Sequence, residues 1–242
     1  MINRGEYELT YYPKVSVILA VYNGEKTIKY AIKSILKQTY KNIELIIVDD
    51  FSSDKTEEIV KKYKVKYLKN TENKGAYFSR NLGIKNATGN IIAIQDADDI
   101  SDKNRILKSV ESLIKNDVEF VLGNGRNMKT LNDNIWPIKV TMATLLCDRI
   151  FFEKYGYYDE NTRHSGDLEI LDRAYFIKFG EYKFKNFWYW LNYTIIKPEF
   201  YYHMYDDMYY IGQEGDRITK KNRIGKRIKY LNERRKYFMN KK

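Results

Sequence analysis

The sequence predicts an α/β fold in which a mostly parallel β-sheet carries helices on both faces. Runs of apolar, β-branched residues alternate four times with helical patterns within the first hundred residues. Strands that are apolar throughout, and that are joined by helices, are typical of a parallel sheet buried on both sides. Polar and acidic residues follow three of these runs, at the edge where open α/β sheets bind their ligands.

The four expected strands are short apolar runs. They cover residues 15–21, 44–48, 65–68 and 91–94. After the first run, apolar residues recur at spacings of three and four, which predicts an amphipathic helix over residues 28–36. Ser52-Ser53-Asp54 is expected to cap a second helix, and a third helix is expected after Gly75.

The pattern becomes less regular after residue 102. Apolar spacing predicts a helix from Ile106 to Ile114, and Phe120 to Gly123 reads as a strand. We expect residues 124–145 to be mixed and residues 151–172 to be rich in loops. The remaining expected elements are a helix at about 168–179, ended by Gly180, and an aromatic strand over 187–196.

Composition is that of a globular chain of 242 residues, of which 43% are hydrophobic. No apolar run approaches the roughly 20 residues of a membrane span, and the first residues lack the apolar core of a secretion signal. Cys147 is the single cysteine, so we expect a buried thiol and a reducing compartment. These features predict a cytoplasmic protein.

The net charge of +11 is concentrated in a C-terminal tail, residues 217–242, which holds 12 Lys and Arg against the single acid Glu233. Residues 1–216 hold 31 basic and 31 acidic residues, and we interpret them as one neutral domain. The tail is expected to be helical. It could lie on an anionic membrane as a peripheral contact, pack on the domain, or fray, whereas we do not expect it to bind nucleic acid.

Acidic residues cluster in Asp96-Ala97-Asp98-Asp99, directly after the fourth apolar run. Three carboxylates so close together repel one another unless a cation or a sugar hydroxyl lies among them. Mg²⁺ and Mn²⁺ prefer oxygen ligands and usually bind one or two carboxylates together with substrate phosphates. The cluster therefore predicts a metal-assisted phosphate-ester site, the alternative being an acidic loop that caps the following helix.

Four stretches of the first half resemble the inverting family two glycosyltransferases of the GT-A type, in the family's order and at its usual spacing. They are Val15–Gly24, Ile47–Asp54, Asn73–Gly83 and Ala87–Asp99. The resemblance covers about residues 14–180. It implies a Rossmann-like GT-A fold, with a nucleotide-binding half at about 14–102 and an acceptor half at about 103–216.

The resemblance implies a role for each matching residue in binding a nucleotide-diphosphate sugar. Tyr22 would stack on the base and Asp50 would accept a ring N–H, while Arg80 would reach the base or the diphosphate. Asp98 would bind Mn²⁺ or Mg²⁺, and Asp99 would contact the sugar or the metal. The donor nucleotide would contact Ala20, Tyr22, Asn23, Asp50, Arg80 and Asp96.

An inverting transfer also needs a carboxylate that takes the proton of the acceptor hydroxyl. The resemblance assigns this base to Asp167, which could equally cap a helix, and Glu169 is the alternative base or a donor-sugar or acceptor contact. Gly166 stands where the family usually has Glu. His164 could contact an acceptor sugar, and His203 could ligate the metal, although packing is the simpler role for it.

The function that follows is metal-dependent transfer of a sugar, with inversion, from a nucleotide-diphosphate sugar to a hydroxyl of a glycan, lipid-linked or protein acceptor. We expect the donor to be a UDP-sugar. A non-catalytic nucleotide-sugar-binding module with a basic tail is the first alternative. A nucleotidyltransferase is less consistent, because Tyr22-Asn23-Gly24-Glu25 lacks a basic, glycine-rich phosphate loop. The aromatic segment Phe187–Trp190 fits either core packing or stacking on acceptor sugars.

Overall fold

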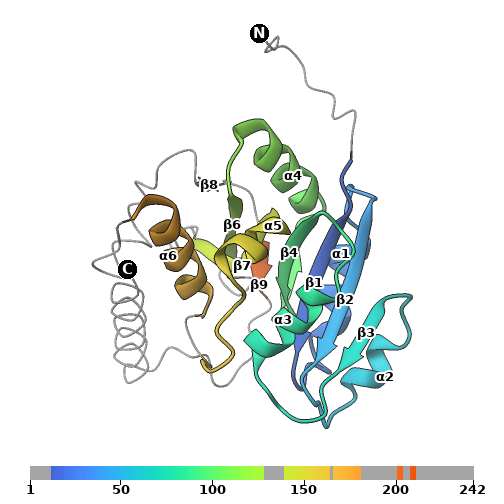
Figure 1. Ribbon diagram of the computed structural model, residues 1–242. Helices are drawn as coiled ribbons and strands as arrows, with labels where there is room; N and C mark the ends of the chain where they lie inside the picture. The colour runs from blue at the N-terminus through green and yellow to red at the C-terminus, as the bar shows by residue number, and fades with distance from the viewer. Residues whose placement is uncertain (1–11, 128–138, 164–165, 181–200, 204–207, 211–242) are drawn as a thin grey trace.

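Among the described residues, the strands form one mixed sheet of nine strands. Figure 1 shows β1, β2 and β4 side by side at its centre. The computed structural model describes residues 12–127, 139–163, 166–180, 201–203 and 208–210. The strands follow the order β3-β2-β1-β4-β7-β6-β9-β5 across the sheet, with β8 also paired to β6. The expected strand at 187–196 and the basic tail lie outside the described residues.

The first four strands run parallel to one another. They are β1 (Val15–Val21), β2 (Ile43–Asp49), β3 (Lys66–Lys69) and β4 (Ile91–Asp96). Strand β1 lies between β2 and β4, so that Val15 pairs with Ile43 on one side and Ile91 on the other. The predicted α/β core with its parallel strands is therefore confirmed.

The remaining strands make the sheet mixed. They are β5 (Asp99–Ser101), β6 (Phe120–Asn127), β7 (Lys139–Asp148), β8 (Tyr201–His203) and β9 (Met208–Tyr210). Strand β7 runs antiparallel to both β4 and β6, and β5 runs antiparallel to β9. The region from 124 to 145, which periodicity left unassigned, thus contains the end of β6 and most of β7.

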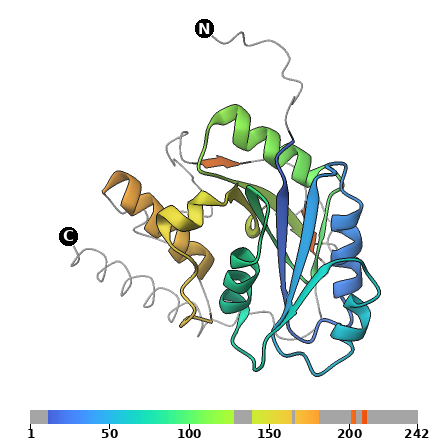
Figure 2. The same cartoon turned by 45° about the vertical axis from the view of Figure 1, so that its right-hand side comes forward.

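Helices cover both faces of the sheet (Figure 2). One face packs against α1 (Ile28–Leu36), α2 (Thr56–Val60) and α4 (Arg105–Asn116). The other packs against α3 (Ala76–Lys85), α5 (Ile150–Tyr155) and α6 (Gly166–Phe179). The first strand serves both cores because its side chains alternate, Ile18 facing one layer and Leu19 the other.

Helix α5 is an element that the loop-rich sequence of 151–172 did not predict. Its six residues are too few to show a helical period, but Phe151, Phe152 and Tyr155 are each about 1% exposed. Cys147 on β7 is fully buried, as predicted, and burial raises the pKa of its thiol well above the ordinary value. Among the described helices, none is long and apolar enough to cross a membrane.

Helix α3 lies unusually close to the sheet because Gly83 faces β1. A Cβ atom at Gly83 would come within 2.5 Å of the Ile18 side chain, so a larger residue would push the helix outward. This close approach holds the N-terminal part of α3, which carries Tyr77 and Arg80, over the sheet. Gly83, at the end of the third sequence stretch, therefore allows α3 to pack closely on β1.

Candidate active site

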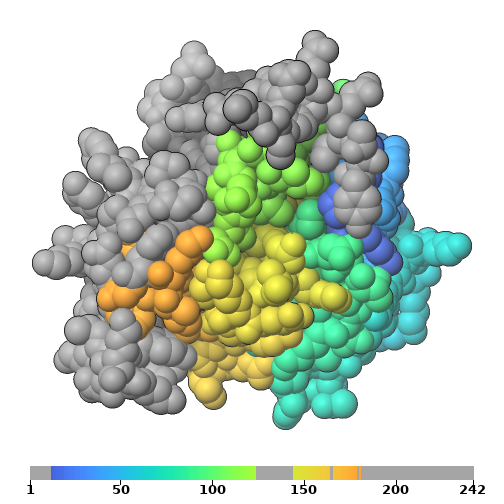
Figure 3. Space-filling view, turned by 45° about the horizontal axis from the view of Figure 1, so that its top comes forward, coloured from blue at the N-terminus to red at the C-terminus, as the bar shows by residue number. Residues whose placement is uncertain are grey.

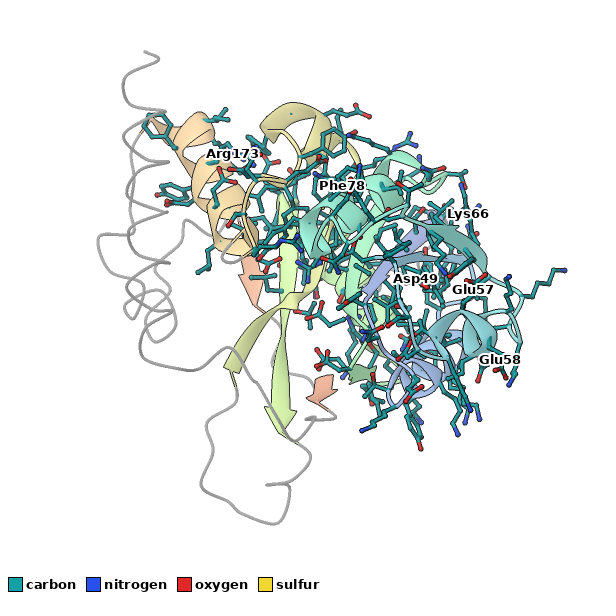
Figure 4. All side chains as sticks on the ribbon, turned by 90° about the horizontal axis from the view of Figure 1, so that it is seen from below. Asp49, Glu57, Glu58, Lys66, Phe78 and Arg173 are labelled. Carbon is teal, nitrogen blue, oxygen red and sulfur yellow. The ribbon has the colours of Figure 1, made fainter. Side chains whose placement is uncertain are left out.

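The candidate site lies at the carboxyl ends of β1, β2 and β4, which adjoin one another in the sheet. Ala20 on β1 pairs with Val48 on β2 and with Asp96 on β4, so three of the four sequence stretches meet here. Figure 4 shows Asp49 at the end of β2 and Phe78 on α3, the helix that also carries Arg80. The fold therefore brings together the residues that the sequence placed at a nucleotide site.

Hydrogen bonds join the loop after β1 to the loop after β2. The backbone N–H of Asn23 donates to Ser52 Oγ at 2.8 Å, and Asn23 Oδ1 accepts from the Ser53 N–H at 2.9 Å. Gly24 N–H donates to Thr56 Oγ1 at 2.8 Å. The Asn23 side chain is thus used in shaping the loop, while the neighbouring ring of Tyr22 is 55% exposed.

Asp50 organises a third loop from within. Its carboxylate, in a residue only 3% exposed, accepts from Asn70 Nδ2 at 2.8 Å and from the backbone N–H groups of Lys74 at 2.8 Å and Gly75 at 2.7 Å. Gly75 has φ +95, a backbone conformation that favours glycine. Asp50 therefore fixes the 70–75 segment, which leads into α3.

Arg80 is the centre of the site. Its guanidinium, 8% exposed, donates to Asp96 Oδ1 at 2.7 Å and to Asp167 Oδ1 at 2.5 Å. Burial disfavours the charged form, but the carboxylates of Asp167 and Asp96 outweigh it and raise the pKa of Arg80 well above its ordinary value. A permanent cation thus links Asp96, a predicted contact of the donor nucleotide, to Asp167, the predicted base.

Tyr77 holds Asp167 from the other side, a contact that the sequence did not predict. Its hydroxyl donates to Asp167 Oδ2 at 3.0 Å, and burial together with Asp167 raises the pKa of Tyr77, so the phenol stays protonated. A Cβ atom at Gly166 would lie 2.8 Å from the Tyr77 ring. The ring therefore fills the space where the side chain of the family's usual Glu would begin.

The acidic turn after β4 brings three carboxylates together. One ligand oxygen each from Asp96, Asp98 and Asp99 lies within 4.8 Å of the other two, with Asp98 exposed and Asp99 buried. Such a set of hard oxygen donors fits Mg²⁺ or Mn²⁺. Strand β5 separates the turn from α4, so the turn does not cap that helix.

A buried polar frame beneath the turn was also missed from the sequence. Gln95 Nε2 donates to the backbone oxygens of Asp96 and Asp99, each at 3.0 Å. Arg105 donates to Gln95 Oε1 at 2.7 Å and to Ser101 Oγ at 2.9 Å. Burial lowers the pKa of Arg105 to about 10, although the nearby acidic side chains oppose the shift. The sequence feature that could have indicated this frame is Gln95, a polar residue that directly follows the apolar run 91–94.

Asp167 and Glu169 differ sharply in their surroundings. Asp167 lies in the first turn of α6, after its first residue Gly166, so it is not the residue that caps the helix. Glu169 is 2% exposed and forms an ion pair with Arg173 at 2.9 Å, a residue that Figure 4 shows on α6. The structure therefore brings Asp167, but not Glu169, into contact with Arg80.

Asn81 fastens the segment before α6 to α3. Its side chain accepts from the Tyr158 N–H at 3.1 Å and donates to the Tyr158 carbonyl at 2.9 Å and to Glu160 Oε1 at 2.8 Å. In the space-filling view, the yellow surface around residues 150–163 meets the blue-green surface of α3 (Figure 3). His164 and the side chain of His203 lie outside the described residues.

The chain matches a family model and several known proteins. The model for glycosyl transferase family 2 matches residues 16–184. An Escherichia coli UDP-Glc:alpha-D-GlcNAc-diphosphoundecaprenol beta-1,3-glucosyltransferase is 39% identical over 141 residues, which are 54% of each chain. The present chain thus spans about half the length of this curated relative.

Two solved structures share the fold. TarS of S. aureus in complex with UDP-GlcNAc has a TM-score of 0.66 at 22% identity, over 84% of this chain and 60% of TarS. A mannosyltransferase of Pyrobaculum calidifontis, solved with GDP-Man and Mn²⁺, has a TM-score of 0.59 at 22% identity, over 69% of this chain and 53% of that protein. The family match over most of the chain, together with this GT-A architecture, shows that the chain belongs to glycosyl transferase family 2.

Proposed function

We propose that this chain transfers a sugar, with inversion and with the help of a divalent metal, from a UDP-sugar to a hydroxyl of a glycan, lipid-linked or protein acceptor. The observation that carries the proposal is the bridge that Arg80 makes between Asp96 and Asp167. It links a cluster of metal-binding character to a carboxylate that can act as a base. The names of the relatives, which include UDP-Glc and UDP-GlcNAc, support a uridine nucleotide.

The donor would lie across the ends of β1, β2 and β4. The exposed side chain of Tyr22 offers a ring face on which the base can stack. Three hydrogen bonds occupy three of the about four lone-pair positions of the Asp50 carboxylate, which leaves one for a ring N–H. Asp96, partly exposed, would accept from the ribose hydroxyls next to Ala20 and Asn23. These roles use the loops that hydrogen bonds already hold in place.

The acidic turn would hold Mn²⁺ or Mg²⁺, with the exposed Asp98 as the principal ligand and Asp99 beside it. When bound, the cation would neutralise the diphosphate and stabilise it as a leaving group. The frame of Gln95, Ser101 and Arg105 fixes the turn before the ligand arrives. A turn that is ordered in advance loses less conformational entropy on binding.

Asp167 would act as the base. A carboxylate offers about four lone-pair positions, and Arg80 and Tyr77 occupy only two of them, so an acceptor hydroxyl can still donate to Asp167. The proton of the acceptor hydroxyl would pass to Asp167 while the hydroxyl oxygen bonds to the anomeric carbon from the side opposite the diphosphate. The bond between that carbon and the diphosphate oxygen would break, and the nucleoside diphosphate would leave. The hydrogen bond from the Arg80 guanidinium holds the Asp167 carboxylate in position for this step.

The proposal is tested with Asp98→Asn and Asp167→Asn, using UDP-GlcNAc as the probe in the presence of Mn²⁺. We expect Asp98→Asn to lose the Mn²⁺-dependent rise in melting temperature caused by the donor, and Asp167→Asn to keep it but lose turnover, measured as UDP release. Asp117→Asn, an exposed position at the end of α4 with φ +48, is the matched control and should behave as wild type. Turnover that persists in Asp167→Asn would refute the assignment of the base.

A second candidate is a module that binds a nucleotide sugar without turning it over. Gly166, in the position where the family usually has Glu, is the observation that favours it, because one carboxylate of the acceptor side is missing. Under this alternative, wild type would show the Mn²⁺-dependent stabilisation by UDP-GlcNAc but no UDP release with any acceptor or with water. UDP release by wild type would eliminate it.

A further inference from the structure

Phe51 combines a strained backbone conformation with an exposed aromatic side chain. It has φ +67, in the left-handed region that bulky residues rarely adopt, and its side chain is 51% exposed. An exposed apolar ring contributes little burial energy, and glycine would adopt this backbone without strain. Strained residues of this kind persist where the surrounding structure enforces them, and they cluster at ligand sites.

The surrounding hydrogen bonds fix the backbone of Phe51 on both sides. Asp50 N–H donates to the Val21 carbonyl at 2.8 Å, and Ser52 N–H donates to Asp49 Oδ1 at 2.8 Å. The Asp49 side chain is itself held by the Tyr67 hydroxyl at 2.7 Å. The ring is therefore presented to solvent by a backbone that has little freedom to relax.

The position of Phe51 relates it to the proposed nucleotide site. Strand register pairs Val21 with Asp49, and hydrogen bonds join Asn23 to Ser52 and Ser53. Tyr22 comes one residue after Val21, the last residue of β1, and Phe51 comes two residues after Asp49, the last residue of β2. Two half-exposed aromatic residues therefore follow the adjoining ends of neighbouring strands, the edge where open α/β sheets bind their ligands.

We propose that Phe51 is a second aromatic contact of the donor nucleobase, acting together with Tyr22, and that it helps to determine which nucleotide is bound. This inference rests on the proposed function. A planar ring contributes to affinity through the face of a base, whichever hydrogen bonds the base makes, and makes no contact with the diphosphate. The ring should therefore affect nucleotide binding while leaving pyrophosphate binding unchanged.

The test compares wild type with Phe51→Gly and Phe51→Leu by calorimetric titration with UDP, GDP and inorganic pyrophosphate, all with Mn²⁺. We expect both variants to bind the preferred nucleotide roughly fivefold to tenfold more weakly and pyrophosphate as wild type does. Phe51→Gly should also melt at or above the wild-type temperature, because glycine relieves the positive φ. Tyr30→Ala, which removes a ring 45% exposed on α1, is the matched control and should change none of these values.

The outcomes separate this inference from the proposed function. Unchanged affinity for UDP and GDP in Phe51→Gly would overturn the contact, and so would equal losses for nucleotide and pyrophosphate, which would indicate a disturbed loop. Wild type that binds neither UDP nor GDP would overturn the proposed function and the Phe51 contact with it. A selective loss of nucleotide affinity in a variant at least as stable as wild type would establish the contact.

Discussion

The two halves of the site are held in place by different means. In the nucleotide-binding half, loops at neighbouring strand ends hydrogen-bond to one another, as Asn23 does to Ser52 and Ser53. In the second half, the site residue Asp167 and the segment around Tyr158 are fastened to α3, a helix of the first half. The loops after β1 and β2 therefore hold one another, whereas Asp167 of the second half is positioned by α3 of the first. Substitutions at these contacts should separate the two kinds of support.

Removing the cation between the halves should have the largest effect. Arg80→Ala leaves Asp96 and Asp167 facing each other without a counter-ion, and we expect a loss of about 3 kcal/mol in the free energy of unfolding. Urea denaturation measures it. Arg149→Ala is the matched control, because its guanidinium makes one long hydrogen bond of 3.4 Å and its loss should cost less than about 0.5 kcal/mol. Equal costs for the two variants would contradict the central role of Arg80.

Asn81→Ala should detach the second half locally. It leaves the buried backbone groups of Tyr158 without their partner, which predicts a cost of about 2 kcal/mol. Amide hydrogen exchange should accelerate around 156–163 more than in β1 or β2. The control, Asn116→Ala, removes an exposed hydrogen bond within α4 and should leave that region protected. Uniform acceleration over the whole chain would argue against local fastening.

The fit between Tyr77 and Gly166 predicts a non-additive pair. Gly166→Ala places a Cβ atom against the Tyr77 ring and should cost about 1–2 kcal/mol, although alanine normally favours a helix. In a Tyr77→Ala background the same change should cost nothing, and a double-mutant cycle measures the difference. Gly123→Ala, whose Cβ would meet Thr144 at an ordinary 3.5 Å, is the control. Additive costs would show that the ring does not exclude a side chain at 166.

The smallest effect concerns pH and lies within the first half. Burial alone would raise the pKa of Glu44, but hydrogen bonds from Ser16, Thr88 and Lys14 outweigh it and lower the pKa from 4.5 to about 2. Glu44 therefore stabilises the fold above pH 4.5, and this contribution is lost as the pH falls from about 4.5 to 2. Glu44→Gln should flatten the fall of unfolding free energy over this range.

The control for the pH effect is Glu58→Gln, which removes an exposed carboxylate paired with Lys62. Solvent screens such a pair, so the acid dependence should stay close to that of wild type. A wild-type slope in Glu44→Gln would mean that the Glu44 cluster contributes no acid sensitivity.

The parallel core follows from the sequence alone. Apolar runs and helical spacing depend on local periodicity, so strands β1 to β4 and helix α1 were predicted within a residue or two. The clustering of Asp96, Asp98 and Asp99 was also predicted, because these residues are near neighbours in the chain. Helix α5 and most of β7 were not predicted from the sequence, because a short helix and a mixed residue pattern show little hydrophobic periodicity.

The contacts between side chains of the candidate site depend on the tertiary structure. Tyr77 and Arg80 lie some ninety residues before Asp167, and no local pattern indicates that they share its carboxylate. Glu169 and Asp167 look alike in the sequence, yet one turns to Arg173 and the other to Arg80. The positive φ of Phe51 is also not predictable from the sequence, because the hydrogen bonds around it involve Val21 on β1 and Tyr67 on β3. Hydrophobic periodicity in the sequence indicates which face of each segment packs against the core. Contacts between segments distant in the sequence form only when the whole chain folds, so local patterns do not indicate them.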